Sequence, residues 1–503
     1  MSAQSCSRSR SRLEGCNLKN DLEKDLDGLA QVFTLHSYCL GLLHREPELR
    51  GALSDEFRCC PGLASLIAAD WELIEGSEAP KFVGEMRSLS EENNIAFYLE
   101  RGDYYDAVDF DDSVYRTLDG FSAGRAAAGK YELVLIDEYQ DFNALEAGLI
   151  GVLGTDNPIV VAGDDDQALY SQLRDASWDH IRLLSTEGEF EVFELPFCMR
   201  CPKVVVEAVA DIILKARSLN RLEGRIDKPY KHFAPVKGAD SAKYPTIANV
   251  QTSVQSKVAN YMGRYIAQEV AAIPQDEIDA AVAGGYPAAL VIVAKPYRDQ
   301  IIGYLESDGY TVESRHESGA MTNRDMGLSI LKEDETSNLG WRIVMDADSP
   351  SFLQDALRTA GVSQRLVDGI PVAYREALLE EAAAFQDEAV ESAGDANETT
   401  AKPSVRVTSF EGAKGLSAQH VFIAGLHDGE LPHDPAAIKD IEICRFVVGL
   451  TRTRKKCTLL HAGRFGTGWK SPSTFISWIS DTRLDSITVN KDYWALAHES
   501  AEE

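Results

Sequence analysis

The chain has 503 residues, of which 44% are hydrophobic and 26% are charged. These are ordinary values for globular proteins, so they exclude a largely disordered chain, and the length predicts about three or four structural units. The longest apolar run, near residues 288–294, is far shorter than the ~18 residues of a membrane span, so no membrane partner is expected.

The net charge of −30 argues against nucleic-acid binding over the whole surface, because phosphate contacts come from lysine and arginine. A protein that acts on nucleic acid needs only one basic groove, however, and the rest of its surface can be acidic. High acidity can also reflect a salty cytoplasm or a means of staying soluble. Composition alone leaves these alternatives open.

The first residues and the cysteines indicate the compartment. Residues 1–17 are rich in Ser and Arg, lack the apolar segment of a signal peptide, and are predicted to be a disordered tail. The nine cysteines show no regular framework, which fits reduced thiols. Cys198 and Cys201 form a CxxC motif without two further ligands at a suitable spacing, so packed thiols are favoured over zinc or redox chemistry. We therefore expect a cytoplasmic protein.

The first predicted elements precede a stretch of small polar residues. Residues 18–33 have apolar residues at helical spacing and then a short strand, which leads into Thr34, His36 and Ser37. A lone histidine between apolar neighbours is more often structural than functional. From about residue 54 to 130 the pattern is helical, and its aromatic residues are assigned to the core rather than to base stacking.

Two short apolar runs between residues 131 and 170 each end in carboxylates and a glutamine. The first is followed by Asp137, Glu138 and Gln140, and the second by the acidic triplet 164–166 and Gln167. Such β-branched runs predict strands buried on both faces of a parallel sheet. Ligands of open α/β sheets bind beyond the carboxyl ends of the strands.

The chemistry of an adjacent Asp and Glu at such a strand end suits a nucleotide triphosphatase. One carboxylate holds Mg2+ through its water shell, and the other orients and deprotonates the attacking water. A lone Asp-Glu pair would more often be a solvated turn. Two such clusters on successive strands favour the functional interpretation.

Further along the chain, Arg174 lies in a turn, for which surface solvation is the simpler explanation, and Arg200 precedes a predicted helix. Residues 288–295 are a buried strand followed by an amphipathic helix, which begins a second α/β unit. Residues 317–402 are predicted to be helical, and their end resembles a linker. A strand then leads into the tight turn GAKG, and Arg452 follows an apolar run, where a helix-surface arginine is the alternative.

These motifs resemble, in order, those of the UvrD/Rep-like helicases of superfamily one. The strings that carry the resemblance are TLHSYC (34–39), DFDD (109–112), DEYQD (137–141), GDDDQALY (163–170), LPFCMRCP (195–202), SFEGAKGLSAQHVFI (409–423), VVGLTRTRKK (447–456) and PSTFISWI (472–479). Each string alone is weak, but the ordered set, which runs from about residue 18 to 479, is specific.

The resemblance implies an α/β fold with two RecA-like parallel-sheet domains, the first incomplete, and inserted helical subdomains. The implied units are a tail (1–17), RecA-like domain 1 (18–190) with a helical insertion (about 54–130), the first part of RecA-like domain 2 (191–316), a helical subdomain (317–402), the second part of domain 2 (403–485) and a tail (486–503).

The resemblance also implies an ATP-dependent DNA helicase or translocase that moves 3′ to 5′ in repair or recombination. Its cofactors would be ATP and Mg2+, and its partners single-stranded or tailed duplex DNA and repair proteins. The implied residues are Glu138, Gln167, Arg200 and Arg452 for catalysis, Asp137, Gln140, Gly415 and Ser417 for the nucleotide, Asp137 for the metal, and Thr34, His36, Ser37, Tyr170 and Arg174 for DNA.

The chain departs from the family within its motifs and ahead of them. Cys198 stands where the family has Asn, Met199 where it usually has a tyrosine stacked on adenine, and Ser417 where its glutamate contacts the ribose. The glycine-rich P-loop, expected ahead of Leu18, is absent, and the lookalikes at 124–131 and 463–471 are rejected on spacing and order.

A gene model that starts too late is the favoured explanation of the missing P-loop, because a sheet beginning at this point would leave an exposed edge and apolar surface. The alternatives are a degenerate chain that binds DNA or a partner without ATP turnover, and an acidic scaffold that binds no DNA.

Overall fold

The computed structural model describes residues 30–90, 94–186, 188–252, 260–314, 323–385, 402–465, 468–490 and 492–494. The predicted tail at 1–17, most of the segment 18–33 with its expected helix, and most of the expected linker lie outside the described residues. In the ranges given above, no helix combines the length and the apolar character that crossing a membrane requires.

The first part of the described chain is mainly helical. Its helices are α3 (Leu35–Arg45), α4 (Pro47–Arg50), α5 (Leu63–Glu75), α6 (Phe82–Ser88), α7 (Asn94–Tyr105), α8 (Phe110–Ser122), α9 (Ala144–Asp156), α10 (Ser171–Arg174), α11 (Asp179–Thr186) and α12 (Lys203–Ser218), with the 3-10 helices η1 (Tyr139–Asp141) and η2 (Asp165–Gln167). The strand expected just before His36 is not found at residues 30–34.

Three parallel strand pairs accompany these helices. They are β1 (Arg58–Cys59) with β2 (Ala107–Val108), β3 (Val134–Ile136) with β4 (Ile159–Val161), and β5 (Phe197–Cys198) with β6 (Lys231–His232). The aromatic residues between 54 and 130 pack inside this part, as predicted. Tyr98 and Tyr105 are buried, and Trp71 meets Phe82 and Phe97 edge-on.

A parallel seven-stranded sheet organises the rest of the chain. Its order is β15 (Leu484–Val489), β7 (Ile247–Thr252), β12 (Thr453–Ala462), β11 (Ala418–Ala424), β8 (Ala289–Val293), β10 (Val405–Thr408) and β9 (Val312–Ser314). The other elements are α13 (Ala234–Lys243), α14 (Asn260–Ala271), α15 (Gln275–Ala283), α16 (Lys295–Ser307), α21 (Phe410–Ala413), α22 (Asp440–Thr451), β13 (Arg464–Phe465), β14 (Gly468–Trp469), η4 (Thr474–Trp478) and η5 (Asp481–Arg483).

The two faces of this sheet are covered by different helices. Side chains of a strand alternate between faces, so Val421 and Ile423 of β11 pack with α12 and α22, whereas Phe422 packs with α14 and α16. The predicted strand β8 is buried along its whole length. This three-layer arrangement confirms the α/β fold class.

The predicted tail is wrong at its start. Residues 486–489 form the end of the edge strand β15, and Val489 is fully buried against β7 and the helices behind it. The alternating apolar positions at Ile487 and Val489 are enough for a half-covered strand.

The prediction that the strands before the two acidic clusters are buried on both faces is also wrong. Ile136, Ile159 and Val161 pack against the core that contains α9. Leu135 and Val160, which point to the opposite face, are 71% and 52% exposed. Among the described residues, β3 and β4 pair only with each other, so one side of this small sheet is uncovered.

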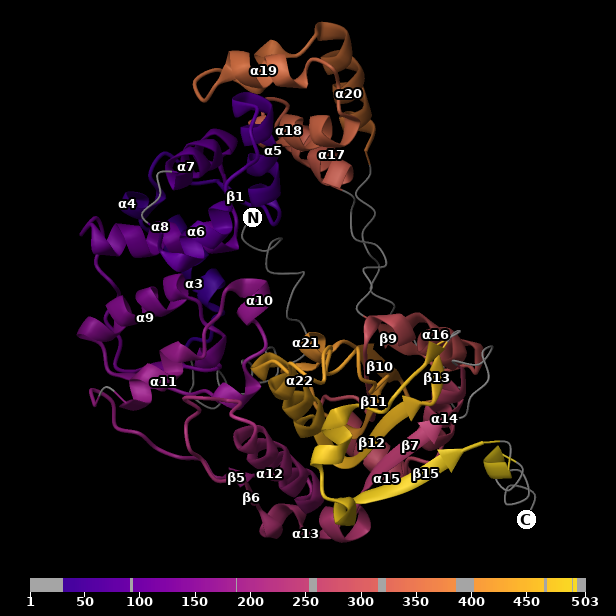
Figure 1. Cartoon of the computed structure of the whole chain (residues 1–503). Helices are drawn as coiled ribbons and strands as arrows, with labels where there is room; N and C mark the ends of the chain where they lie inside the picture. The colour runs from indigo at the N-terminus through magenta and orange to yellow at the C-terminus, as the bar shows by residue number, and fades with distance from the viewer. Residues whose placement is uncertain are drawn as a thin grey trace.

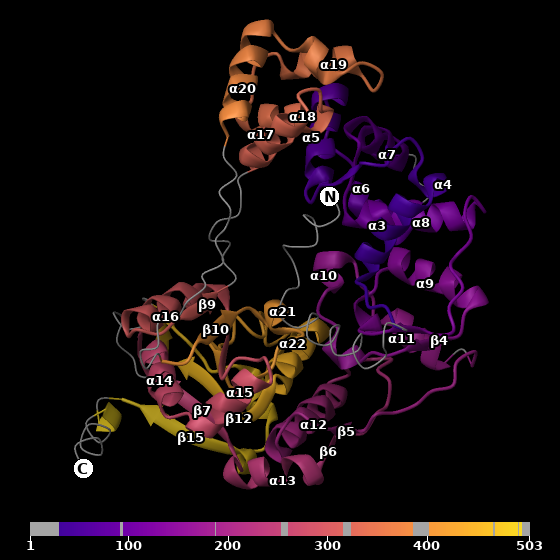
Figure 2. The same ribbon diagram turned by 180° about the vertical axis from the view of Figure 1, so that it is seen from behind.

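Residues 323–384 are mainly helical, as the pattern of 317–402 predicted. The helices are α17 (Asn323–Glu333), α18 (Asn338–Asp348), α19 (Leu353–Ala360), η3 (Leu366–Gly369) and α20 (Val372–Ala384). Their core also takes in Leu73 and Ile74 of α5. Figures 1 and 2 show this group beside α5 and away from the seven-stranded sheet.

Candidate functional site

The two acidic clusters meet at the carboxyl ends of β3 and β4. Asp137 and Glu138 directly follow β3 and are exposed. Glu138 takes a left-handed conformation, with φ +56°, which turns the chain into η1. The buried Gln140 donates its side-chain amide to Glu138, and its Oε1 accepts the backbone N–H of Asp164 at 3.0 Å. Gln140 therefore joins the two strand ends.

The second acidic cluster begins at Gly163, a position without room for a side chain. A Cβ atom at this position would lie 2.5 Å from Gln140 Oε1 and 2.5 Å from Ile181 Cδ1. With any other residue at this position, Gln140 or Ile181 would have to shift.

Gln167 lies on η2 and contacts the second half of the chain directly. Its Oε1 accepts a hydrogen bond from Arg452 Nη2 at 2.8 Å, and its Nε2 donates to Asp164 Oδ2 at 2.7 Å. Figure 1 shows α22, at whose end Arg452 lies, next to the chain that leads from α10 and α11. The structure thus brings together two predicted catalytic residues that are 285 positions apart.

Arg452 lies at the junction of α22 and β12 and is almost fully buried. Its Nε donates to Val448 O at 3.0 Å, and its Nη1 donates to Leu416 O at 3.3 Å. It is therefore not a helix-surface arginine. Its guanidinium is fixed by the backbone of two elements and presented to Gln167.

The predicted residue Arg200 lies at the same helix end but is exposed. Its Nη1 donates to the backbone oxygen of Thr451 at 3.3 Å. Thr451 immediately precedes Arg452, so Arg200 is hydrogen-bonded to the backbone directly beside Arg452.

The sequence analysis missed Lys414, which bridges the two halves. This buried lysine follows α21, and its Nζ donates to Gln167 O at 2.6 Å and contacts Asp141 Oδ2 at 2.5 Å. It also lies 3.5 Å from Glu138 Oε2. Burial raises the pKa of Asp141, and the charge of Lys414 acts in the opposite direction. The signal in the sequence was the lysine of the GAKG turn.

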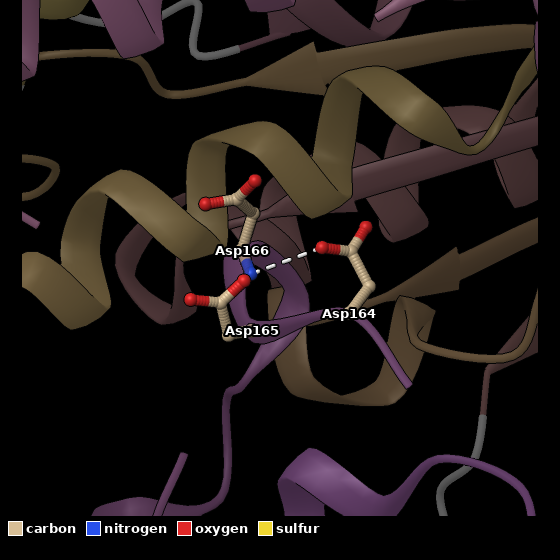
Figure 3. Close-up of side chains that lie close together, drawn as sticks. All are labelled: Asp164, Asp165 and Asp166. Carbon is tan, nitrogen blue, oxygen red and sulfur yellow. Dashed lines mark hydrogen bonds between the residues drawn. The ribbon is translucent and has the colours of Figure 1, made fainter. Parts of the chain in front are cut away.

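The acidic triplet 164–166 is surrounded by positively charged side chains of the chain itself. Figure 3 shows the three carboxylates gathered around the turn of η2, and they are the only group of three or more potential ligands close together in the described ranges. Lys228 contacts all three, Arg225 binds Asp166, and Arg182 binds Asp165. Although burial acts to raise it, the pKa of Asp164 is held below its usual value by Lys228. The chain's own cations neutralise this cluster.

Asp137 is the better match to a Mg2+ ligand. Its carboxylate is exposed, and Oδ1 accepts the Glu138 N–H at 2.9 Å. Mg2+ takes oxygen ligands, keeps several waters, and usually has one or two protein carboxylates beside substrate phosphates. The donor set at the end of β3 fits that demand.

The two other predicted nucleotide contacts lie on the turn after α21. Gly415 adopts φ +79°, which favours glycine. The buried Ser417 hydroxyl accepts from Arg454 Nε at 2.9 Å. Ser417 therefore serves first as a support for Arg454.

The residues predicted to touch DNA lie in two places. The loop expected at Thr34 to Ser37 is the first turn of α3, since the Thr34 hydroxyl caps the helix by accepting the Ser37 N–H at 3.2 Å. Both residues are exposed. Tyr170 instead lies at the contact with the second half, where its hydroxyl donates to Glu411 O at 3.2 Å.

His36 and Arg174 meet at one carboxylate. Arg174 Nη2 donates to Glu146 Oε1 at 2.9 Å, and His36 Nε2 lies 3.7 Å from the same oxygen. Burial, followed by the charge of Arg174, lowers the pKa of His36 to about 4. His36 is therefore neutral at pH 7 and cannot offer a positive charge to a phosphate.

We expect His36 to make the protein sensitive to acid. Its pKa in the folded protein lies below the unfolded value, so its contribution to stability is complete above about pH 6.5 and is lost as the pH falls toward 4. Replacing it in His36→Gln should reduce the loss of unfolding free energy over this range by about 1–3 kcal/mol. Urea unfolding at pH 7 and pH 4.5 measures this, with the exposed His433→Gln as control. An equal acid-induced loss in His36→Gln and the unmodified chain would contradict it.

Comparisons with known proteins agree with the resemblance that the motifs show. Residues 63–187 match the model of the UvrD/REP helicase N-terminal domain. The proteins called ATP-dependent DNA helicase UvrD2 from Mycobacterium bovis and Mycobacterium tuberculosis are each 25% identical to the chain over 435 residues, which is 77% of this chain and 56% of the relative. The chain thus spans little more than half the length of these relatives. The predicted resemblance is confirmed: this chain is similar to the UvrD/Rep-like helicases.

Proposed function

We propose that the chain is the motor part of an ATP-dependent DNA helicase or translocase that hydrolyses ATP between two RecA-like domains. The observation that carries the proposal is the set of contacts from Lys414 and Arg452 to Glu138 and Gln167. A carboxylate, a glutamine, a lysine and an arginine from two separate α/β parts converge at one strand edge, where an α/β sheet binds its ligand.

The proposed roles follow from the position of each group. Glu138, whose carboxylate is held by Gln140, accepts a proton from the attacking water. Gln167 and Arg452 donate hydrogen bonds to the terminal phosphate, and Arg200 adds a second positive charge from the exposed side. Mg2+, when bound at Asp137, neutralises phosphate charge.

The same contacts provide a route from chemistry to movement. Lys414 and Arg452 donate to Gln167, and a phosphate placed there would compete for the same donors. Each cycle would therefore change how the two α/β parts contact each other. We propose that this change moves single-stranded DNA past Thr34 and Ser37, with 3′-to-5′ direction and a role in repair or recombination.

A cytoplasmic location belongs to the same proposal. Among the described residues, the thiols of Cys39, Cys198, Cys201, Cys444 and Cys457 are free. Free thiols are typical of a reducing compartment.

The experiment is ATP hydrolysis by the chain with and without single-stranded DNA. We expect DNA to stimulate hydrolysis, and Glu138→Gln to lower the stimulated rate by about 10²- to 10⁴-fold, the usual range for a general base. Glu132→Gln, an exposed glutamate ahead of β3, should leave the rate unchanged.

Binding of single-stranded DNA separates the alternatives in the same samples. Binding should weaken as salt rises, as expected for phosphate contacts, and should survive in Glu138→Gln. Salt-sensitive binding without any hydrolysis would favour a chain that binds DNA without turnover. No binding at all would favour an acidic scaffold.

A further inference from the structure

The CxxC motif places two thiols of different character side by side. Cys198 ends β5 and is half-buried, whereas Cys201 is buried and directly precedes Pro202, the N-cap of the 16-residue helix α12. The backbone N–H of Cys201 donates to Cys198 Sγ at 3.4 Å, and the Cys201 thiol donates to Thr451 O at 3.5 Å.

The surroundings shift the pKa values of the two thiols in opposite directions. Hydrogen bonding from the Cys201 side chain lowers the pKa of Cys198 to about 5, with further help from the N–H groups of Cys201 and Arg200 and against the effect of burial. The same side-chain hydrogen bond and burial raise the pKa of Cys201. Cys198 is thus the accessible thiolate and Cys201 the protonated partner, which is how a CxxC pair divides attack and resolution.

A metal ion is not the better explanation of this pair. Within the described ranges, no third His, Cys, Asp or Glu ligand atom lies close enough to join the two sulfur atoms, because the one group of three or more potential ligands is the triplet 164–166. A structural zinc site needs four ligands.

We propose that Cys198 and Cys201 form a reversible disulfide by exchange with a small-molecule disulfide of the glutathione type. The Cys198 thiolate attacks one sulfur of the reagent, the reagent's S–S bond breaks, and one thiolate leaves. Cys201 then gives up its proton, attacks Cys198 Sγ, and releases the second thiol. Two electrons pass from the cysteine pair to the reagent, which ends as two thiols.

The disulfide would act on the arginine contacts of the candidate site. Cys201 Sγ lies 3.5 Å from Thr451 O, the same oxygen that accepts from Arg200 Nη1 at 3.3 Å. Oxidation removes the thiol proton from this contact and closes a ring around Met199 and Arg200. We expect oxidation to slow DNA-stimulated ATP hydrolysis and a dithiol reductant to restore the rate. This expectation rests on the proposed function, whereas disulfide formation does not.

The test uses the full chain, reduced, freed of reductant, and exposed to oxidised glutathione. The intact mass is measured first; the remaining thiols are then alkylated, and the peptides are analysed. We expect the unmodified chain to lose the mass of two hydrogen atoms, to carry no glutathione, and to yield a Cys198–Cys201 cross-linked peptide before any other cysteine reacts. Cys201→Ser should retain one glutathione on Cys198, and Cys198→Ser should retain none at this motif.

Cys59→Ser, which removes another half-buried thiol, is the matched control and should behave like the unmodified chain. Full alkylation of Cys198 and Cys201 after oxidation, or a stable glutathione adduct on Cys198 of the unmodified chain, would overturn the proposal. Because the readout is mass, it remains decisive even if the chain hydrolyses no ATP. A disulfide that forms without changing the hydrolysis rate would overturn only the link to Arg200.

Discussion

Replacing Arg452 by lysine is expected to lower DNA-stimulated ATP hydrolysis by about 10³-fold or more, the lower end of the range for an arginine that stabilises charge during phosphoryl transfer. Lysine keeps the charge but not the planar set of donors. The Arg452 guanidinium reaches Val448 O, Leu416 O and Gln167 Oε1 at once. A lysine ammonium cannot hold all three and still present a donor to phosphate.

The control for this prediction is Arg483→Lys, which changes an arginine that pairs with Asp211 on α12. Its hydrolysis rate should stay close to that of the unmodified chain. The unfolding midpoint of each variant shows whether the change is structural. A stable Arg452→Lys variant that hydrolyses ATP within about threefold of the unmodified rate, well inside the tenfold that 1.36 kcal/mol represents, would remove Arg452 from the mechanism.

The second large effect is expected at Asp70, a fully buried carboxylate that joins two groups of helices. It accepts hydrogen bonds from Arg101 Nε at 2.9 Å and from Arg342 Nε at 2.6 Å. Arg342 lies on α18, and the Arg101 and Asp70 side chains lie on α7 and α5. Asp70→Asn would leave two buried guanidinium groups without their shared counter-charge, so we expect a loss of about 3–5 kcal/mol of unfolding free energy.

Urea denaturation measures this loss, and Asp346→Asn is its control. Asp346 also pairs with Arg342, at 2.9 Å, but its side chain is 49% exposed, so its replacement should cost at most about 1 kcal/mol. Limited proteolysis would show whether the helices of residues 323–384 separate from α5 before the rest unfolds. A change below about 1 kcal/mol in Asp70→Asn would contradict the structural role given to this ion pair.

Local patterns in the sequence predicted the elements well where burial is continuous. The run before Lys295 predicted the central strand β8, and the helical spacing after Arg200 predicted α12, because an apolar side chain at every position or at every third to fourth position has few other ways to be buried. The ordered motifs predicted the α/β class and placed Gln167 and Arg452 in one site.

Contacts between distant segments were not predictable in the same way. Leu135 has the character of a buried strand residue, yet its exposure depends on which other segments cover that face. The pairing of Arg342 with Asp70 spans 272 positions, and no local pattern announces it. Lys414 was overlooked because its role depends on Asp141 and Gln167 lying opposite its turn, which only the packing of the two α/β parts determines.

The account depends most on Gln167 and Arg452 belonging to a single ATP site formed by two parts of the chain, and a double-mutant cycle tests this directly. DNA-stimulated turnover is measured for Gln167→Ala, Arg452→Lys, the double variant and the unmodified chain. If both residues act on the same phosphate, their effects are not additive, and we expect a coupling energy of about 0.5–3 kcal/mol. Additive losses, or no DNA-stimulated hydrolysis by the unmodified chain, would contradict the account.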